Sequence, residues 1–275
     1  MLLRPVSHPE AQPRFLLNGF PKAGLHLLAL LVAPIADPPD GTLWEHGDWW
    51  GVLYNIWTLR WRDERALRGQ FWKLARLEPG HYLRGHIAYR EDVAAHIDNC
   101  GISHVFIRRD LRDVAVSLAH HVLDPTADAK HTGKALYMLM DDFDDVLEAA
   151  ITGVGPYAGV VDRWRQYQGW LDAPRTLCIR YEDALERREE AAEAILRYGL
   201  ERIRDVFDVD WMLDPRRFAQ GIAAMVKTSY ETHRSPTFRT GQTGGWREAF
   251  KERHIEAFKR AGGYEALAAM GYEED

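Results

Sequence analysis

The stretch FLLNGFPKAGLH, residues 15–26, indicates the fold class of the chain. Its first apolar residues are typical of a buried strand, and the apolar pattern after Gly24 predicts a helix. In the turn between them, Pro21 restricts the backbone and Gly24 permits its close approach to a ligand. The N–H groups at the start of the helix and the charge of Lys22 would together attract an anion. The sequence therefore predicts a strand, a turn and a helix, and the turn by itself is only weak evidence for an anion site.

This turn differs from the phosphate loop of P-loop NTPases. The pattern GxxxxGK[ST] places a lysine after the second glycine and then a hydroxyl residue that binds Mg²⁺. Here Lys22 precedes Gly24, and Leu25 and His26 follow it. The sequence therefore disfavours an ATP- and Mg²⁺-dependent kinase of the P-loop type, which we keep as an alternative.

Apolar runs at residues 15–17, 104–107 and 176–179 are each followed by charged residues and a helical pattern. This alternation indicates an α/β fold with a central, mainly parallel sheet flanked by helices. Helices are expected at three places: from Gly24 to about Val32, from Asp110, and from Asp141. The acidic residues after Asp141 favour a helix start over a metal site, because they complement the helix dipole.

Composition restricts the class of protein. The chain has 275 residues, 46% of them apolar, which suffices for one sizeable core, and we expect a single domain over residues 1–275. Its formal net charge of −6 argues against general binding to nucleic acids or anionic membranes. No run reaches about 18 apolar residues, and the N-terminus does not resemble a signal peptide. Cys100 and Cys178 lack disulfide or metal spacing. A cytoplasmic protein is expected.

A second stretch, HVFIRRDLRDVAVSLAHH, residues 104–121, concentrates positive charge at the carboxyl end of a predicted strand. Three arginines stand within five residues: Arg108, Arg109 and Arg112. Such a concentration of like charge is unfavourable without an anion, unless the neighbouring aspartates pair with it. The stretch is compatible with an anion site and with an Asp-paired surface.

A third stretch, TFRTGQTGGWREAF, residues 237–250, places three glycines after Arg239. Glycine-rich loops flanked by arginine commonly wrap phosphates. By itself, the stretch could equally be a plain surface loop.

Together, these stretches resemble the cytosolic sulfotransferase family, which uses 3′-phosphoadenosine 5′-phosphosulfate (PAPS). FPKAGLHLL resembles the 5′-phosphosulfate loop of the family, IRRDLRDVAVS its 3′-phosphate motif, and FRTGQTGGW its carboxyl-terminal loop. LRGHIAY is similar to the family segment KTHLP, and CIRYEDAL to the family element YEDL. Five motifs in the same order imply a P-loop-like sulfotransferase fold and a PAPS-dependent sulfotransferase that requires no metal.

The resemblance also implies residues that bind the donor. Lys22 would stabilise the leaving phosphate, and Tyr181 matches a tyrosine near the adenine ring. The other residues of the 5′-phosphosulfate loop are Ala23, Gly24, Leu25 and His26. The 3′-phosphate would be held by Arg109, Ser117, Arg239, Thr240 and Gly241.

Two residues of LRGHIAY match positions that act at the sulfonate. Arg84 stands where the family has a sulfonate-facing lysine, and His86 stands where it has its catalytic base. His86 also precedes Arg109 by the family spacing, and an unperturbed imidazole pKa of about 6.5 suits proton transfer near neutral pH. The resemblance implies that His86 deprotonates an acceptor hydroxyl or amine. His26, His120 and His121 are secondary candidates for ligand contacts.

Some residues depart from the family pattern. Leu25 and His26 replace two threonines of the phosphosulfate loop, so a hydroxyl contact must be lost or replaced. Leu27 replaces an aromatic residue that stacks on adenine. Thr240 and Gly245 replace a lysine and an aspartate of the carboxyl-terminal loop. None of these changes removes the residues assigned to the chemistry.

Aromatic residues bear on the acceptor. Six of the ten tryptophans lie within residues 44–72, and they are compatible with core or lid packing, an acceptor pocket or a partner surface. With Tyr82 and Tyr89 near His86, they favour a small aromatic or apolar acceptor over a charged glycan. A non-catalytic nucleotide-binding protein is a further alternative. We expect no nucleic-acid or membrane partner, and the sequence leaves the oligomeric state open.

Overall fold

A five-stranded parallel sheet lies at the centre of the computed structural model, which describes residues 12–38, 52–54, 71–124, 134–207, 214–231 and 241–273. The strand order is β2-β3-β1-β4-β7, and every neighbouring pair is parallel. The strands are β1 (Phe15–Gly19), β2 (Val52–Tyr54), β3 (Tyr82–His86), β4 (Ser103–Arg108) and β7 (Thr176–Arg180). The prediction of a mainly parallel sheet is therefore confirmed.

β1 is a central strand, paired with β3 on one side and β4 on the other, and its whole length is buried. Parallel strands covered on both faces read as continuous apolar runs, and FLL fits this pattern. The predicted strand segments at residues 15–17, 104–107 and 176–179 lie within β1, β4 and β7. A short antiparallel pair, β5 (Gly153–Val154) and β6 (Tyr157–Ala158), lies apart from the main sheet.

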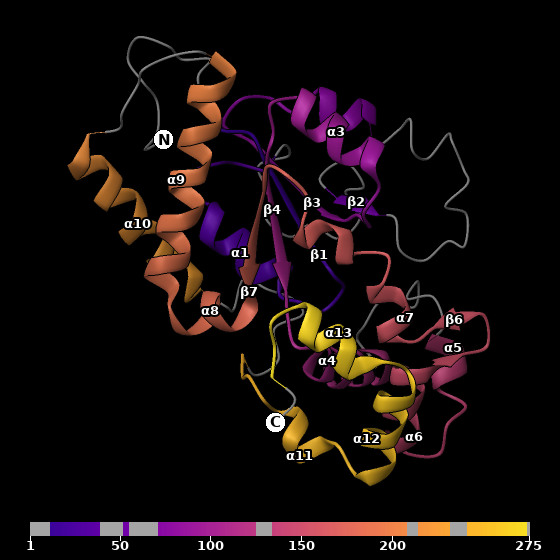
Figure 1. The fold of residues 1–275 in the computed structure, drawn as a ribbon. Coiled ribbons are helices and arrows are strands. Elements are labelled where there is room, and N and C mark those ends of the chain that lie inside the picture. Colours follow the sequence, from indigo (N-terminus) through magenta and orange to yellow (C-terminus); the bar gives the residue numbers. More distant parts are fainter. Residues whose placement is uncertain are drawn as a thin grey trace.

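Helices cover both faces of the sheet (Figure 1). One apolar cluster joins the sheet to α1 (Leu25–Val32), α8 (Tyr181–Glu186), α9 (Arg188–Phe207) and α10 (Pro215–Ser229). A second cluster, on the other face, includes α3 (Glu91–Asn99), α4 (Leu111–Leu123), α5 (Lys134–Tyr137), α6 (Phe143–Thr152), α7 (Val160–Trp164), the 3-10 turn η1 (Gln168–Leu171), α11 (Trp246–Ala249), α12 (Glu252–Arg260) and α13 (Gly263–Ala269). The arrangement is a three-layer α/β fold.

The predicted helix starts agree with the structure. Asp110 caps α4 by accepting a hydrogen bond from the Arg112 backbone N–H at 2.8 Å. Asp142 caps α6 in the same way, through the Asp145 N–H at 2.9 Å. The acidic segment after Asp141 is thus a helix start, as predicted, because its carboxylates satisfy N–H groups that the helix leaves unpaired.

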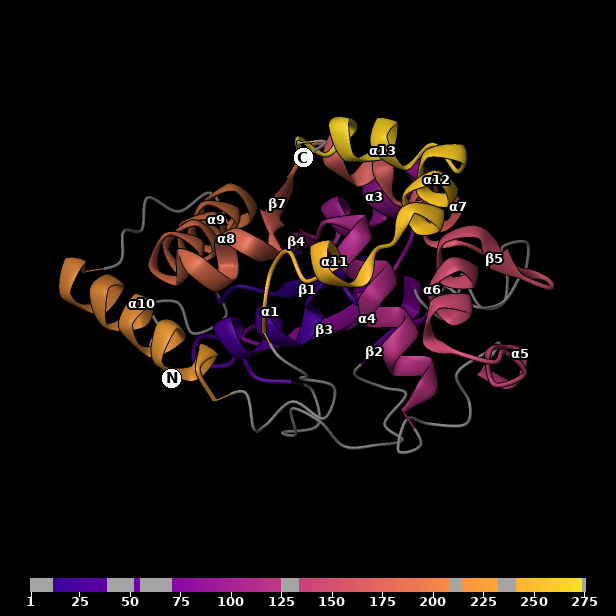
Figure 2. The ribbon, with the colours of Figure 1, turned by 90° about the horizontal axis from the view of Figure 1, so that it is seen from below.

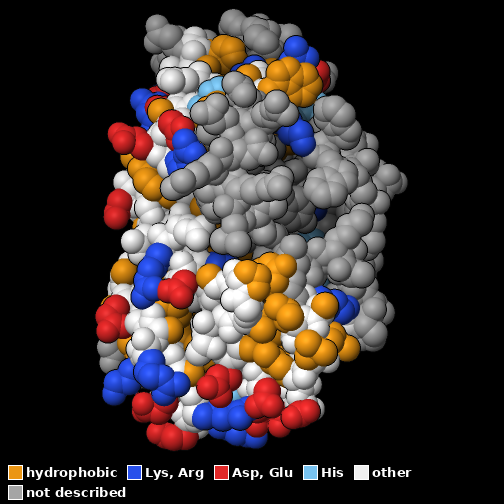
Figure 3. Space-filling model, turned by 90° about the vertical axis from the view of Figure 1, so that its right-hand side faces the viewer, with side chains coloured by type: hydrophobic (Ala, Val, Ile, Leu, Met, Phe, Trp, Pro, Cys, Tyr) orange, Lys and Arg blue, Asp and Glu red, His pale blue; other side chains and the backbone are white. Residues whose placement is uncertain are grey.

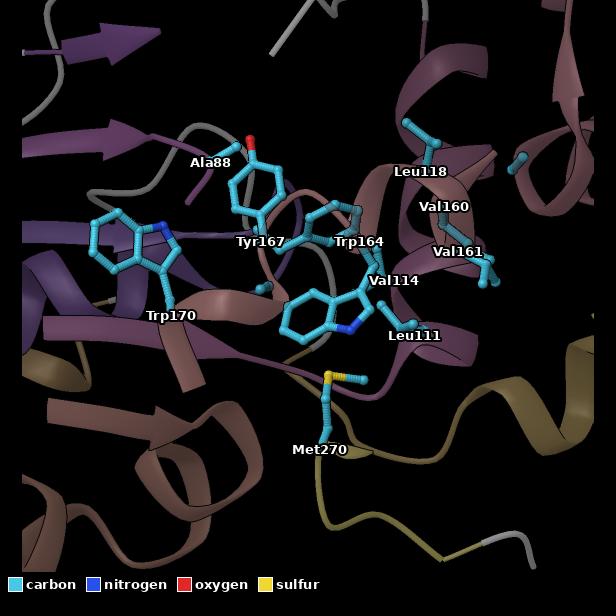
Figure 4. Packing of buried hydrophobic residues seen from close by; sticks show 14 of the residues in the cluster. Ala88, Leu111, Val114, Leu118, Val160, Val161, Trp164, Tyr167, Trp170 and Met270 are labelled. Atoms are coloured by element: carbon cyan, nitrogen blue, oxygen red, sulfur yellow. The ribbon is translucent and has the colours of Figure 1, made fainter. Parts of the chain in front are cut away.

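Aromatic residues anchor the end of β1 in the core. Phe20 makes edge contacts with Trp164 and Tyr167, at ring-centroid distances of 5.8 and 5.1 Å. Figure 4 shows Trp164 beside Leu111 and Val114 of α4, with Tyr167 and then Trp170 further from this helix. Burial of each such ring stabilises the fold by about 1.5–3 kcal/mol. The packing therefore fixes the point where the chain leaves β1 for the turn.

Exposed apolar side chains are few among the described residues. Of the predicted tryptophan cluster the structure describes only Trp72, which is 47% exposed under the Arg76 guanidinium, and the other five lie outside the described residues. Met138 and Leu139, after α5, are also exposed. Figure 3 views the molecule from the right-hand side of Figure 1 and shows apolar side chains gathered on the lower part of that side. Within the described part of the chain, no helix combines the length and apolar character needed to span a bilayer.

Candidate active site

The predicted site residues follow the carboxyl ends of neighbouring strands. β1 leads into the turn that contains Lys22, and β3 ends at His86. β4 and β7 are followed by Arg109 and Tyr181. Figure 2 looks onto this edge, where α1, α4, α8 and α11 lie near one another. Parallel α/β sheets bind their ligands at this edge, so the topology brings the residues together.

The turn after β1 has an uncommon backbone. Lys22 has φ 68° and Gly24 has φ 101°, and the Ala23 N–H donates to the Phe20 carbonyl at 3.0 Å. A left-handed conformation costs a non-glycine residue roughly 1–2 kcal/mol. Among the described residues, no side chain caps α1 at Gly24, so the first N–H groups of this helix point toward the turn. A helix start of this kind stabilises an anion.

Gly24, Tyr181 and Arg109 form a stack beside this turn. A side-chain Cβ on Gly24 would lie 2.2 Å from Tyr181 Cδ2, so only glycine fits against the ring. The Arg109 guanidinium lies 4.3 Å from the centroid of the same ring, and its Nη2 donates to the Gln242 carbonyl at 3.0 Å. Arg109 thereby links the turn after β1 to the segment that contains Gln242.

His86 is held in one tautomer. Its Nδ1 lies 2.8 Å from the Gly19 carbonyl oxygen, which can only accept, so Nδ1 carries the proton and the neutral ring has its lone pair on Nε2. Burial lowers the pKa of His86 to about 4, against the opposing effect of this hydrogen bond. The charges of Lys22 and Arg84 lower it further. The imidazole is therefore neutral at pH 7 and able to accept a proton.

A cluster of basic side chains surrounds the start of α1. The pKa of His26 is well below its usual value, chiefly because of burial and then because of nearby positive groups. The main ones are Arg84 and Lys22, and the nearby imidazoles of His86 and His121 have smaller effects. The turn and β3 thus each bring one positive side chain, Lys22 and Arg84, close to His26, which suits an anionic ligand.

The family model of the sulfotransferase domain matches residues 94–271, about two thirds of the chain. The chain belongs to the sulfotransferase family. Its predicted family, fold and enzyme class are confirmed. The matched segment contains Arg109, Ser117, Tyr181 and Gly241, whereas Lys22 and His86 lie before it.

Solved structures share the fold of this sulfotransferase at low sequence identity. The mouse sulfotransferase SULT7A1, complexed with PAP, is 16% identical, with a TM-score of 0.59 over 96% of this chain and 89% of that chain. A retinol dehydratase in complex with retinol and PAP is also 16% identical, with a TM-score of 0.53 over 93% and 82% of the two chains. A search of curated protein sequences gave no match.

The three clustered arginines of the sulfotransferase have different surroundings. The Arg112 guanidinium donates to both carboxylate oxygens of Asp110, from Nη2 at 2.8 Å and from Nε at 3.1 and 3.2 Å, and lies over the Trp246 ring. Arg108 donates to the Met270 carbonyl. Of the three, Arg109 faces the turn, with Nη1 3.5 Å from the Lys22 carbonyl, and its Nη2 lies 3.7 Å from the Asp113 carboxylate. The Asp-paired interpretation therefore fits Arg112 and in part Arg109, and the anion-site interpretation fits Arg109.

Asp113 holds the glycine-rich loop in place. It accepts hydrogen bonds from the Gly244 N–H at 2.8 Å and the Trp246 N–H at 3.0 Å. Gly241 begins this described segment with φ 61°. Arg239 and Thr240 lie outside the described residues. The loop is therefore fixed to the start of α4, next to Arg109.

The remaining predicted residues lie in varied positions. Ala23, Leu25 and Leu27 are buried. Ser117 is partly exposed, two turns into α4. Tyr82 is only 1% exposed and packs within the apolar cluster on the α1 face of the sheet.

Residues that the sequence analysis did not single out support His86. The Tyr167 hydroxyl donates to the His86 carbonyl at 3.0 Å. Asn18, inside β1, bonds to the backbone on either side of the imidazole, through Gly19 and Ile87. The sequence signal for the role of Asn18 is its polar amide within an otherwise apolar, buried strand.

Proposed function

We propose that this sulfotransferase transfers a sulfuryl group from PAPS to a hydroxyl or amine of a small aromatic or apolar acceptor. The main support is the position of His86, whose neutral imidazole lies among the charges of Lys22 and Arg84 beside the start of α1. A proton acceptor and groups that stabilise negative charge are what in-line transfer between two oxygens requires.

Each of these residues has a distinct role. His86 Nε2 accepts the proton of the acceptor as its oxygen or nitrogen attacks. Lys22 stabilises the negative charge that develops on the leaving phosphate, and Arg84 stabilises the sulfonate. The N–H groups at the start of α1 add fixed dipoles that need no reorganisation during the reaction.

Donor binding would use both sides of the turn. The backbone of residues 23–26 and the side chain of His26 would contact the 5′ end of PAPS, and Tyr181 would lie near the adenine. Arg109, Ser117 and Gly241, with Arg239 and Thr240, would hold the 3′-phosphate. The family match and the PAP complexes of the two structural neighbours support PAPS as the donor.

The acceptor is proposed to be small and apolar. Two structures of retinol dehydratase contain retinol and androsterone, respectively, and they match this chain with TM-scores of 0.53 and 0.51. Tyr89, three residues after His86, is partly exposed and packs edge-on against Trp170 at 5.2 Å. We further propose one domain over residues 1–275, a cytoplasmic location and a reaction that needs no metal.

PAP should raise the midpoint of thermal unfolding without any metal. At about 100 times its dissociation constant, a ligand that binds only the folded state adds about 2.7 kcal/mol, or several degrees for a chain of this size. Differential scanning fluorimetry with PAP and EDTA, set against ATP with Mg²⁺, measures this. A rise with ATP and Mg²⁺ alone would favour the kinase alternative, and PAP binding without turnover would favour a non-catalytic nucleotide-binding protein.

Replacing Arg109 with alanine should weaken PAP binding about 10- to 100-fold, because one charge-assisted contact to phosphate contributes about 1.5–3 kcal/mol. Isothermal titration calorimetry measures the change. Arg112→Ala is the matched control: its guanidinium pairs with Asp110, so its loss should lower the unfolding midpoint and leave PAP affinity nearly unchanged. Equal PAP affinity in Arg109→Ala and the wild type would overturn this assignment.

A further inference from the structure

Asn18 is a fully buried amide in the central strand, with 0% exposure. Burying a polar group in a core is unfavourable unless hydrogen bonds replace its contacts with water. An apolar side chain would fill the same place in β1 at no such cost. The contacts of Asn18 therefore indicate what the residue does.

Asn18 uses all of its hydrogen-bonding capacity. Its Oδ1 accepts from the Gly19 N–H at 2.9 Å and from the Ile87 N–H at 2.8 Å. Its Nδ2 lies 2.9 Å from the Ile87 carbonyl and 3.2 Å from His104 Nε2. Because the Ile87 N–H can only donate and its carbonyl can only accept, the orientation of the amide is fixed.

This orientation also fixes the tautomer of His104. Nδ2 of Asn18 donates, so His104 Nε2 accepts, and its Nδ1 carries the proton toward Thr176 Oγ1 at 2.9 Å. Burial lowers the pKa of His104 to about 3, which keeps the ring neutral. A buried polar chain thus runs from β7 through β4 and β1 to the end of β3, and each link determines the next.

The backbone groups that Asn18 contacts adjoin those that hold His86: the Gly19 N–H is on the same residue as the carbonyl that His86 contacts, and the Ile87 N–H shares a peptide with the His86 carbonyl. The Gly19 carbonyl accepts the His86 Nδ1 proton, and Ile87 follows His86 directly. Two aromatic residues add to the same clamp. Tyr167 donates to the His86 carbonyl, and Trp170 donates from Nε1 to the Ile87 carbonyl at 2.8 Å. Figure 4 shows the Tyr167 hydroxyl directed toward Ala88, the residue after Ile87.

We propose that Asn18 is a positioning residue that holds the His86 imidazole in its Nδ1-protonated orientation by fixing Gly19, whose carbonyl accepts the Nδ1 proton, through its N–H, and by fixing the peptide that joins His86 to Ile87. Asn18 touches no reacting atom, and its effect passes through these backbone groups. This proposal rests on the proposed function, in which His86 Nε2 accepts the proton of the acceptor.

The test compares Asn18→Ala with the wild type in steady-state kinetics. Small displacements of a catalytic group can cost about 10²-fold in rate, so kcat should fall about 10- to 100-fold. PAP affinity should change by no more than about twofold, because Lys22, Arg109 and Tyr181 are left in place. Val105→Ala is the matched control, since Val105 is equally buried in β4 but belongs to the cluster on the opposite face of the sheet. It should lower the unfolding midpoint without lowering kcat.

A second readout is independent of turnover. NMR of ¹⁵N-labelled histidine in the protein without donor should show His86 as a single Nδ1-protonated tautomer in the wild type. A mixture of tautomers is expected in Asn18→Ala. The proposal is overturned if Asn18→Ala keeps the wild-type tautomer, or if Val105→Ala loses as much kcat. If the wild type transfers no sulfuryl group, the proposed function fails, and the tautomer measurement still decides whether Asn18 positions His86.

Discussion

His86→Ala should lower kcat for sulfuryl transfer by about 10²–10⁴-fold, the usual range for loss of a general base. The physical reason is that the hydrogen bond from Nδ1 to the Gly19 carbonyl leaves the lone pair of the neutral ring on Nε2. Alanine removes this proton acceptor and leaves the turn and Arg109 in place. PAP affinity should therefore remain close to that of the wild type, as titration calorimetry can verify.

His81→Ala is the matched control for this variant. His81 directly precedes β3, at the end opposite His86, and its Nδ1 lies 3.2 Å from the Pro79 carbonyl. Its loss should leave kcat unchanged. Turnover of His86→Ala at the wild-type rate would exclude His86 as the base, and a parallel loss of PAP affinity would indicate a damaged donor site instead.

The pH dependence of kcat gives a further check on His86. Its pKa is lowered to about 4, so the imidazole stays neutral, and kcat level, as pH falls from 7 to about 5. Below this, protonation should reduce kcat in the wild type, and the reduction should be absent from the residual rate of His86→Ala. If kcat instead fell with a midpoint near pH 6.5, the unperturbed pKa of an imidazole, the lowered pKa of His86 would be contradicted.

Stability must be followed in the same pH series. The folded-state pKa values of His86 and His104 are both depressed, so their contribution to stability is full above about pH 6.5, the unfolded pKa. It is lost as the pH falls toward the folded values, because the unfolded state then binds more protons. Circular dichroism at each pH separates this loss of folded protein from protonation of the base.

The sequence predicted the parts of the fold that local patterns encode. β1, β4 and β7 were found because they carry apolar runs, and their paired lengths extend one or two residues further, to ends such as Arg108 and Arg180, which are paired in register. β3 was missed because Arg84 and His86 interrupt its apolar pattern. These residues can belong to a strand because β1 and β2 pair with it on both sides.

The candidate site divides in the same way. Lys22, Gly24 and Arg109 were found from local motifs, and the structure brings the turn and Arg109 together around Tyr181. Local motifs could not predict the backbone partners of His86 and Arg109, which are the Gly19 and Gln242 carbonyls, because a backbone carbonyl has no side-chain signature. A hydrogen bond to a carbonyl depends on strand register and on loops more than 60 residues away in the chain.

The directions of the clustered arginines also depend on distant residues. Arg108 reaches the Met270 carbonyl, and Arg112 lies 3.8 Å from the Trp246 ring. The sequence showed the local charge and the neighbouring aspartates, but not that the carboxyl-terminal segment crosses the ends of β4 and α4. Arg108 and Arg112 contact this carboxyl-terminal segment through Met270 and Trp246, whereas Arg109 is directed at the turn after β1.

Lys22→Met should lower kcat by about 10²–10³-fold, the usual cost of removing one preorganised group that stabilises charge in the transition state. Methionine keeps most of the length of the side chain and removes its charge. The protein already accepts the cost of a left-handed backbone at this residue, with φ 68°, and the helix start beside it directs its N–H groups to the same place. Such strain tends to persist where a side chain must be held in a functional position.

Two further variants separate the charge of Lys22 from its backbone. Lys22→Gly relieves the left-handed strain, so it should raise the unfolding midpoint while losing as much kcat as Lys22→Met. Lys22→Arg keeps the charge and should recover part of the rate. Single-turnover measurements with saturating PAPS isolate the transfer step from binding. If Lys22→Met retains the wild-type single-turnover rate, the leaving phosphate is stabilised by other groups, with Arg84 and the N–H groups at the start of α1 the nearest candidates.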